Sequence, residues 1–270
     1  NMKILKSQIF KNYTSLSLNH GAHILLNILL VPLFLKFWDI STYADWILLS
    51  TIPAILSLGE LGLTSYGSNL IVILYNKKKK NRVNFTFQNI IFFSIAIILT
   101  IGLILILFNF FFNLNKFLKL NSLNDTEFFL VLIFLVFKYM LLTKANFINS
   151  LFRMNNQYHL TVYLQTFFIT TEIILITIIL FLGGSIIEVS VIGLFNYIIA
   201  FFVSYYLIKK EFKWLKIIDL NNIDFLFLKK IFYPSISFMT GNLCKMILIN
   251  GTIIVLKIYS SELIVILYNS

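Results

Sequence analysis

Residues 87–112, with the sequence FQNIIFFSIAIILTIGLILILFNFFF, contain no charged side chain. A helix needs about 20 mostly apolar residues to cross the roughly 30 Å hydrocarbon core of a membrane, so this stretch predicts a transmembrane helix. The apolar run is continuous rather than alternating, which favours a helix over a strand of a membrane barrel. Six other stretches have the same character, and an eighth begins near Ser261. The six are residues 15–37, 43–63, 128–152, 160–182, 189–208 and 234–256.

The composition of the whole chain agrees with these stretches. Its 270 residues are 59% hydrophobic and 12% charged, with a mean hydropathy of +0.89. A soluble domain has about 45–50% apolar and about 25% charged residues, and a soluble globule of this length has too little interior to bury the excess. We therefore expect an all-α, polytopic helical bundle in a membrane. This excludes a soluble enzyme, a nucleic-acid-binding domain and a disordered tail.

Lysine and arginine residues indicate the orientation, because they accumulate in cytoplasmic loops of membrane proteins. With the N-terminus in the cytoplasm, fifteen basic residues fall on the cytoplasmic side. The outer side then receives only Lys36, Lys116, Lys119 and Lys257. We therefore expect a cytoplasmic N-terminus, and we interpret the net charge of +11 as a topology signal rather than as a sign of nucleic-acid binding.

An internal repeat is visible at an offset of 220 residues. The pattern Y-x-S-x-S-x-x-x-G starts at Tyr13, in the first predicted span, and recurs at Tyr233 in the seventh. Ser41 and Ser261 then begin the second and eighth spans at the same offset. Six intervening spans would give both copies the same direction, as in parallel repeats of transporters. Four identities in nine positions also arise by chance, so both interpretations stay open.

If the repeat is real, it divides the chain into three parts. Residues 1–208 form a six-helix transmembrane lobe, and residues 209–232 form a basic, amphipathic cytoplasmic linker, with a plain basic loop that only sets the topology as the alternative. Residues 233–270 are then the truncated start of a second lobe.

Three short motifs resemble a known family. They are Pro32-Leu33, then residues 43–46 (YADW), then residues 57–63 (SLGELGL). Together they resemble the oligosaccharide-lipid flippases of bacterial surface-polysaccharide pathways, in the multidrug/oligosaccharidyl-lipid/polysaccharide exporter superfamily. Ala44 stands where that family often has glycine, and Glu60 is at its acidic position.

The resemblance implies two six-helix lobes around a central cavity in the bacterial inner membrane. It implies that the protein flips undecaprenyl-diphosphate-linked oligosaccharides from the inner to the outer leaflet, for O-antigen or capsule assembly. The implied partners are the lipid-linked oligosaccharide, membrane lipids and other membrane proteins of polysaccharide assembly, and no nucleic acid. Because this chain holds only one lobe and the start of another, we expect it to be C-terminally truncated.

Away from their ends, the predicted spans contain four charged residues, and charge is costly there. Lys138 and Glu172 both lie near mid-membrane, so an ion pair between their helices would lower that cost. Lys144 and Lys245 have no evident acidic partner at their depth. All three lysines are therefore candidates for a cationic cavity that meets a diphosphate-linked glycan. Snorkelling or pairing within the protein is the alternative.

Histidine and asparagine residues supply further candidates. His20 and His23 share one helix face, and Glu60 lies at a similar depth, so a His–Glu cluster could bind a proton. With Glu172, these three residues are the candidate groups for a coupling ion. Asn242 and Asn250 are candidates for contacts with sugar hydroxyls, alongside a simpler role in helix packing. We expect no metal site, because no thiolate or further histidine lies at that depth.

Three other functions remain as alternatives. A multidrug cation antiporter of the same superfamily would need an acidic cavity, which three intramembrane lysines suit poorly. A membrane enzyme of polysaccharide assembly would need a large extramembrane loop or paired catalytic residues, and the sequence has neither. The third alternative is a truncated remnant without function. The sequence has no Walker A pattern and no nucleophile elbow, so we expect no enzymatic activity and no cofactor.

Overall fold

A computed structural model describes residues 2–60, 62–216, 223–260 and 262–269. The chain is 87% helical and has no strand in these residues. Five helices are long and apolar enough to cross a membrane. They are α1 (Met2–Phe37), α5 (Lys80–Phe112), α7 (Asp125–Ser150), α8 (Tyr158–Phe181) and α9 (Ile186–Glu211). The predicted all-α, polytopic bundle is thereby confirmed.

The predicted span 43–63 is broken into two helices. α2 (Ile40–Leu49) has Ser50 as its C-cap, and α3 (Ile52–Gly59) begins two residues after this cap. The Ser50 and Thr51 hydroxyls each donate to a carbonyl three residues back, at 2.6 and 2.7 Å. Pro53 has no backbone N–H with which to continue the helix. The hydroxyl pair and the proline together explain why this span is interrupted.

The predicted span 234–256 is interrupted as well. α10 (Phe225–Lys245) passes into a π-helical turn, η3 (Met246–Gly251), and continues as α11 (Thr252–Tyr259), with α12 (Glu262–Asn269) following. α10 begins nine residues before the predicted start, because the Asp224 carboxylate accepts from two backbone amides of its first turn. Since α9 also extends to Glu211, both predicted boundaries of the linker 209–232 lie inside helices.

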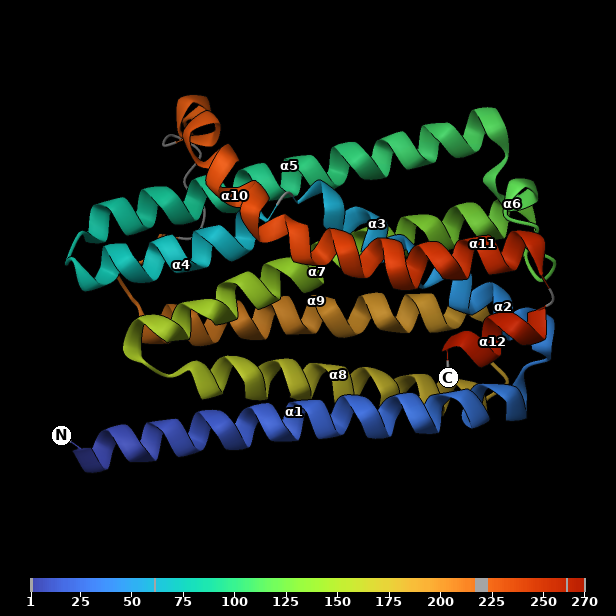
Figure 1. Ribbon diagram of the computed structural model, residues 1–270, viewed down its shortest axis with the longest axis horizontal. Helices are drawn as coiled ribbons and strands as arrows, with labels where there is room; N and C mark the ends of the chain where they lie inside the picture. Colours follow the sequence, from blue (N-terminus) through green and yellow to red (C-terminus); the bar gives the residue numbers. More distant parts are fainter. Residues whose placement is uncertain (1, 61, 217–222, 261, 270) are drawn as a thin grey trace.

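The long helices run roughly side by side along one axis, with α1 at one edge against α8 (Figure 1). The N-terminus, the end of α9 and the turn between α4 (Leu63–Asn76) and α5 lie at one end of the bundle. We call this the basic end, because the turn carries Lys77–Lys79. The short helix α6 (Leu114–Phe117), α2 and α12 lie at the opposite end.

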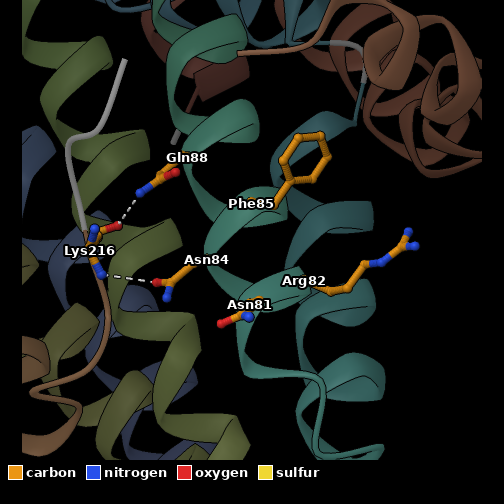
Figure 2. Close-up of a pocket in the computed structure, with 6 residues that line it drawn as sticks. All are labelled: Asn81, Arg82, Asn84, Phe85, Gln88 and Lys216. Carbon is orange, nitrogen blue, oxygen red and sulfur yellow. Dashed lines mark hydrogen bonds between the residues drawn. The ribbon is translucent and has the colours of Figure 1, made fainter. Parts of the chain in front are cut away.

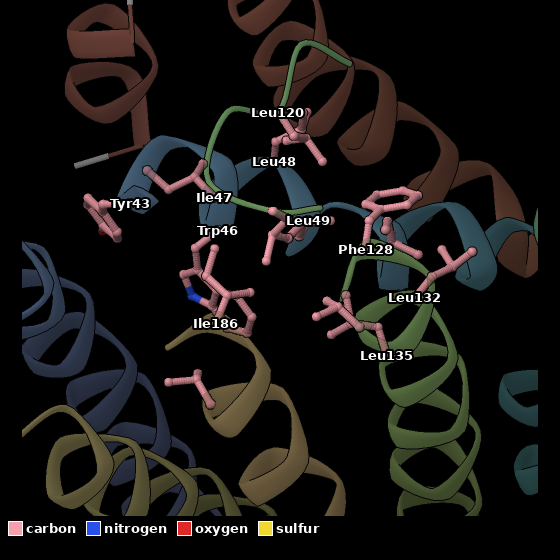
Figure 3. Packing of buried hydrophobic residues seen from close by; sticks show 14 of the residues in the cluster. Tyr43, Trp46, Ile47, Leu48, Leu49, Leu120, Phe128, Leu132, Leu135 and Ile186 are labelled. Carbon is pink, nitrogen blue, oxygen red and sulfur yellow. The ribbon is translucent and has the colours of Figure 1, made fainter. Parts of the chain in front are cut away.

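The two ends have separate hydrophobic cores. At the opposite end, α2 packs its Trp46 and Leu49 against Leu132 of α7 and Ile186 of α9 (Figure 3). At the basic end, the second core includes Phe87 of α5, stacked on Phe147 of α7 with ring centroids 5.4 Å apart. The short helix α2 is therefore a core element rather than a membrane-facing one, because residues 43–49 are all buried.

α10 rests on the start of α4 through a backbone contact at Gly62. The φ angle of Gly62 is +69°, and a Cβ atom there would lie 2.4 Å from the carbonyl oxygen of Ser235. Only glycine tolerates both the left-handed conformation and this close approach. This residue belongs to the motif 57–63, and its missing side chain is what lets α10 sit against the first part of the chain.

Candidate functional site

The ion pair expected between Lys138 and Glu172 is present. Lys138 Nζ lies 2.5 Å from Glu172 Oε1, and the Tyr197 hydroxyl donates to Glu172 Oε2 at 3.0 Å. These side chains come from α7, α8 and α9. Gly193 makes room for the pair, since a Cβ there would lie 3.2 Å from Lys138 Nζ. The three helices are thus joined by one polar cluster near the middle of their lengths.

Lys144 has an acidic partner, so the expectation that it has none is wrong. Its Nζ lies 3.0 Å from Glu60 Oε1 and donates to Ser94 Oγ at 2.5 Å. The side chains of Lys144 and Glu60 are only 2% and 9% exposed. Glu60 was missed as the partner because it directly follows α3, whose position beside α7 follows from the break at Ser50 and Thr51.

A third ion pair lies at the opposite end and was not predicted. Lys257 Nζ of α11 lies 2.6 Å from Asp45 Oδ1 of α2, and both side chains are almost fully buried. Asp45 Oδ2 accepts from the backbone amides of Asn121 and Ser122 at 2.9 Å each. Glu262 of α12 lies 3.4 Å from Lys257. We call these five residues the opposite-end cluster; it connects α2 with α11 and α12.

The predicted His–Glu cluster does not form. Glu60 uses one carboxylate oxygen for Lys144 and accepts from the Thr64 hydroxyl on the other, at 3.1 Å. His20 and His23 lie exposed on α1, and neither bonds to Glu60 in the described part of the chain. Within the described residues, no three His, Cys, Asp or Glu side chains gather where they could hold a metal ion.

Two polar cavities lie on the basic-end side of these pairs. The hydroxyl cavity, of about 260 Å³, lies between the start of α4 and the end of α7. The amide cavity, of about 190 Å³, lies between α1, α7, α8 and α9. The polar lining of the hydroxyl cavity is Glu60, Thr64, Ser65, Ser68, Thr143, Asn146 and Ser150. The polar lining of the amide cavity is Asn19, His23, Asn146, Gln165 and Tyr197. Asn146 lines both cavities, so the two are neighbours.

The polar groups of the two cavities keep unused hydrogen-bonding capacity. The hydroxyls of Thr143, Ser68 and Ser150 each donate to a carbonyl one turn back in their own helix. The hydroxyl oxygens of Thr143 and Ser150 remain free to accept, and Ser68 keeps one lone pair beside the bond that it accepts from Arg153. The side-chain amides of Asn146 and Gln165 make no hydrogen bond within the described residues. The site therefore offers both donors and acceptors.

The cavities carry no net charge from Lys138 or Lys144. Both lysines were candidates for a cationic cavity, and both are neutralised by carboxylates. Asn250 lies in η3, half-buried, and lines neither cavity. Asn242 and Lys245 lie on α10, and their side chains are outside the described part of the chain. In the described lining of the two cavities, Glu60 is paired with Lys144 and His23 is the basic side chain, so the site is polar and has no unpaired carboxylate or lysine.

A larger cavity, of about 500 Å³, lies at the basic end beside α5. Figure 2 shows Asn84 and Gln88 turned toward Lys216, where Asn84 accepts from its backbone N–H and Gln88 donates to its carbonyl, at 2.9 and 3.0 Å. The Arg82 side chain points away from these amides. These two hydrogen bonds hold the segment after α9 against α5. We therefore assign the polar groups of this cavity a structural role rather than ligand binding.

Comparison of the chain with protein-family models, with curated proteins and with solved structures finds no match. The resemblance to oligosaccharide-lipid flippases therefore rests on the motif residues themselves. Two of these residues have clear structural positions: Asp45 anchors the opposite-end cluster, and Glu60 lines the hydroxyl cavity.

Proposed function

We propose that this membrane protein moves lipid-linked oligosaccharides across the membrane. The observation that carries the proposal is the pair of polar cavities that share Asn146, in a bundle with five helices long and apolar enough to span a membrane. A glycan cannot cross hydrocarbon without replacing its bonds to water. Hydroxyl and amide groups inside a helical bundle supply such bonds, while the lipid chain of the substrate stays among the surrounding lipids.

The arrangement of the helices supports a two-lobed transporter. α2 and α12 occupy equivalent places in the predicted repeat, and they pack against each other at the opposite end. The Ser41 hydroxyl of α2 donates to Glu262 of α12 at 3.0 Å. The equivalent serines Ser15 and Ser235 are both fully buried. Contact between equivalent elements is what two lobes related by an axis along the membrane normal would produce.

The predicted orientation gives the cavities a place in the transport cycle. With the N-terminus in the cytoplasm, the basic end faces the cytoplasm and the hydroxyl cavity lies in that half of the bundle. A glycan assembled on the cytoplasmic leaflet would reach this cavity first. The opposite-end cluster would then hold the outer side closed, because it joins α2 to α11 and α12 through buried charges.

A cation antiporter is the weaker proposal. Binding a cationic substrate calls for an acidic group without a partner inside the bundle. Glu60, Glu172 and Asp45 each have a lysine partner within 3.0 Å. In the described residues, the paired acids leave no negative charge for a cationic substrate at these positions.

The test is transport by the purified chain in proteoliposomes. A lipid-linked oligosaccharide with a dithionite-sensitive fluorophore on its glycan is placed in both leaflets, and dithionite is added outside. We expect nearly complete bleaching in vesicles that contain the protein and about half in protein-free vesicles. A labelled phosphatidylethanolamine is the control, and it should be bleached to about half in both. Equal bleaching of the glycan lipid with and without protein would overturn the proposal.

A further inference from the structure

We infer that the hydroxyl and amide cavities form one binding site for uncharged sugar residues, centred on Asn146. This inference rests on the proposed function and specifies which glycans the site accepts. The expectation from the sequence was a cationic cavity for an acidic or diphosphate-linked glycan. The contacts of the described residues favour a different division, with neutral sugar units inside the cavities and the charged part of the substrate outside them.

The first step is the unused amides. Asn146 and Gln165 are half-buried in spanning helices, and their side chains bond to no described residue. A side-chain amide offers two N–H donors and one carbonyl acceptor. Leaving such a group unbonded away from water is unfavourable. A ligand that both donates and accepts hydrogen bonds satisfies these amides, and sugar hydroxyls do so.

The second step is the charge. Glu60 is the acidic residue in the described lining, and both of its oxygens are occupied by Lys144 and Thr64. Lys144 is almost fully buried and is bonded to Glu60 and Ser94, so it cannot turn toward a ligand. In the hydroxyl cavity, a phosphate or a sugar carboxylate would lose its hydration without gaining a cation. The described lining of the amide cavity has no lysine or arginine, and His23 is its basic side chain. A neutral hydroxyl group loses far less.

The third step is the shape of the walls. Phe147 lines the hydroxyl cavity, and Phe168 and Tyr197 line the amide cavity. Ligand sites are typically apolar walls with a few placed polar groups. These three aromatic side chains are almost fully buried, and Phe147 is stacked on Phe87, so they supply firmly packed apolar walls. At about 260 and 190 Å³, the two cavities are smaller than pockets for drug-sized ligands. We therefore expect each to take a single sugar unit, with two consecutive units on either side of Asn146.

The fourth step is where an anion can lie. Arg153 of η1 (Leu151–Asn155) donates to Asn69 at 2.8 Å and to Ser68 at 3.4 Å. It forms no ion pair with the described residues, and it does not line the hydroxyl cavity. Since Ser68 does line that cavity, Arg153 stands next to it on the basic side. The diphosphate linkage can therefore lie near Arg153 while the sugars occupy the cavities.

The experiment measures binding to the full chain in lipid nanodiscs at constant salt. Three probes share one carrier: undecaprenyl diphosphate alone, the same carrier with a neutral disaccharide, and the carrier with a disaccharide that contains a uronic acid. We expect the neutral probe to bind about tenfold more tightly than the other two, as one or two added hydrogen bonds would produce.

Two substitutions test the site itself. Asn146→Leu and Gln165→Leu keep the side-chain size and remove the amide. Each should lower the affinity for the neutral probe by about tenfold and leave the affinity for the bare carrier unchanged. Gln8→Leu is the matched control, because this half-buried amide of α1 also bonds to no described residue and lines neither cavity. If Asn146→Leu fails to fold in a thermal melt, the Gln165→Leu and Thr143→Val variants decide the test.

The outcomes separate the inference from the function on which it rests. Tight binding of the uronic acid probe, or unchanged binding in the variants, would overturn the neutral-sugar site and leave glycan transport standing. If none of the three probes binds the unsubstituted chain, the proposed function fails and the inference fails with it.

Discussion

The Glu60–Lys144 pair and the Asp45–Lys257 pair are chemically alike and structurally different. Both join a carboxylate to a lysine in almost complete burial, at 3.0 and 2.6 Å. The first connects α3 to α7, within the predicted first lobe. The second connects α2 to α11, across the predicted boundary between lobes. If the lobes move, the first pair must persist and the second must break. A buried ion pair can therefore stabilise a lobe or hold two lobes together, and its position in the chain distinguishes the two roles.

The largest expected effect comes from breaking the pair inside the lobe. Glu60→Ala leaves the Lys144 charge buried with only Ser94 as a partner, which we expect to cost about 3–5 kcal/mol of stability. Thermal unfolding in detergent measures it. The double variant Glu60→Leu/Lys144→Met should recover most of the loss, since it removes both charges. A double variant as unstable as the single one would contradict a paired role.

Breaking the Asp45–Lys257 pair between the lobes should lower the stability less, and it should also change the conformation. Asp45→Asn keeps an acceptor for Asn121 and Ser122, and Lys257 retains Glu262 at 3.4 Å. We expect a loss of about 1–3 kcal/mol. The second readout is maleimide labelling of a cysteine placed at Ser41, in a Cys244→Ser background. Labelling should rise several-fold in Asp45→Asn, and unchanged labelling would argue against a conformational role.

Breaking the Lys138–Glu172 pair should also lower the stability, by less than breaking the Glu60–Lys144 pair. Its side chains are 16% and 14% exposed, and Tyr197 holds Glu172 after Lys138 is removed. We expect Lys138→Ala to cost about 1–3 kcal/mol. A double-mutant cycle with Glu172→Ala measures the coupling. If the double variant costs the sum of the two single variants, the two residues do not act as a pair.

The smallest expected loss of stability comes from the N-cap of α2, the helix on which Asp45 lies. Asp39 is the N-cap of this helix, and hydrogen bonds from Thr42 hold the pKa of its carboxyl below the usual 3.8. Because the folded pKa is lowered, the stabilisation is complete above the unfolded pKa and is lost as the pH falls through the folded pKa. Asp39→Ala should cost about 0.5–1 kcal/mol at neutral pH. The unfolding free energies of the variant and the parent should converge as the pH falls below the folded pKa of Asp39, and a constant difference would contradict the cap.

Much of this architecture follows from charge-free stretches of sequence. The run 87–112 predicts α5 because nothing but a helix satisfies its backbone in lipid. The Lys138–Glu172 pair follows from matching depths in neighbouring spans. The Glu60–Lys144 pair does not follow, because depth does not reveal which face a helix turns inward. Residues 50–53 (STIP) do indicate a broken span, through two hydroxyl residues followed closely by a proline, but this signal was not used in the prediction.

The opposite-end cluster and the cavities could not be predicted in the same way. Asp45 and Lys257 are 212 positions apart, and nothing local relates them. The polar cavities combine residues of α1, α4, α7, α8 and α9, so they exist only after those helices pack. Ser65, Ser68 and Gln165 are ordinary polar residues in the sequence, and only their convergence with Asn146 marks them.

The pairing of Lys138 and Lys144 with carboxylates has an electrical consequence. A charge that moves through a membrane field of 100 mV gains or loses about 2.3 kcal/mol. A lysine and a glutamate that move together are a dipole with no net charge, so these two pairs contribute no gating charge when their helices shift. A voltage dependence of the proposed transport should therefore come from charges outside these two pairs, including those of the substrate or of a coupling ion.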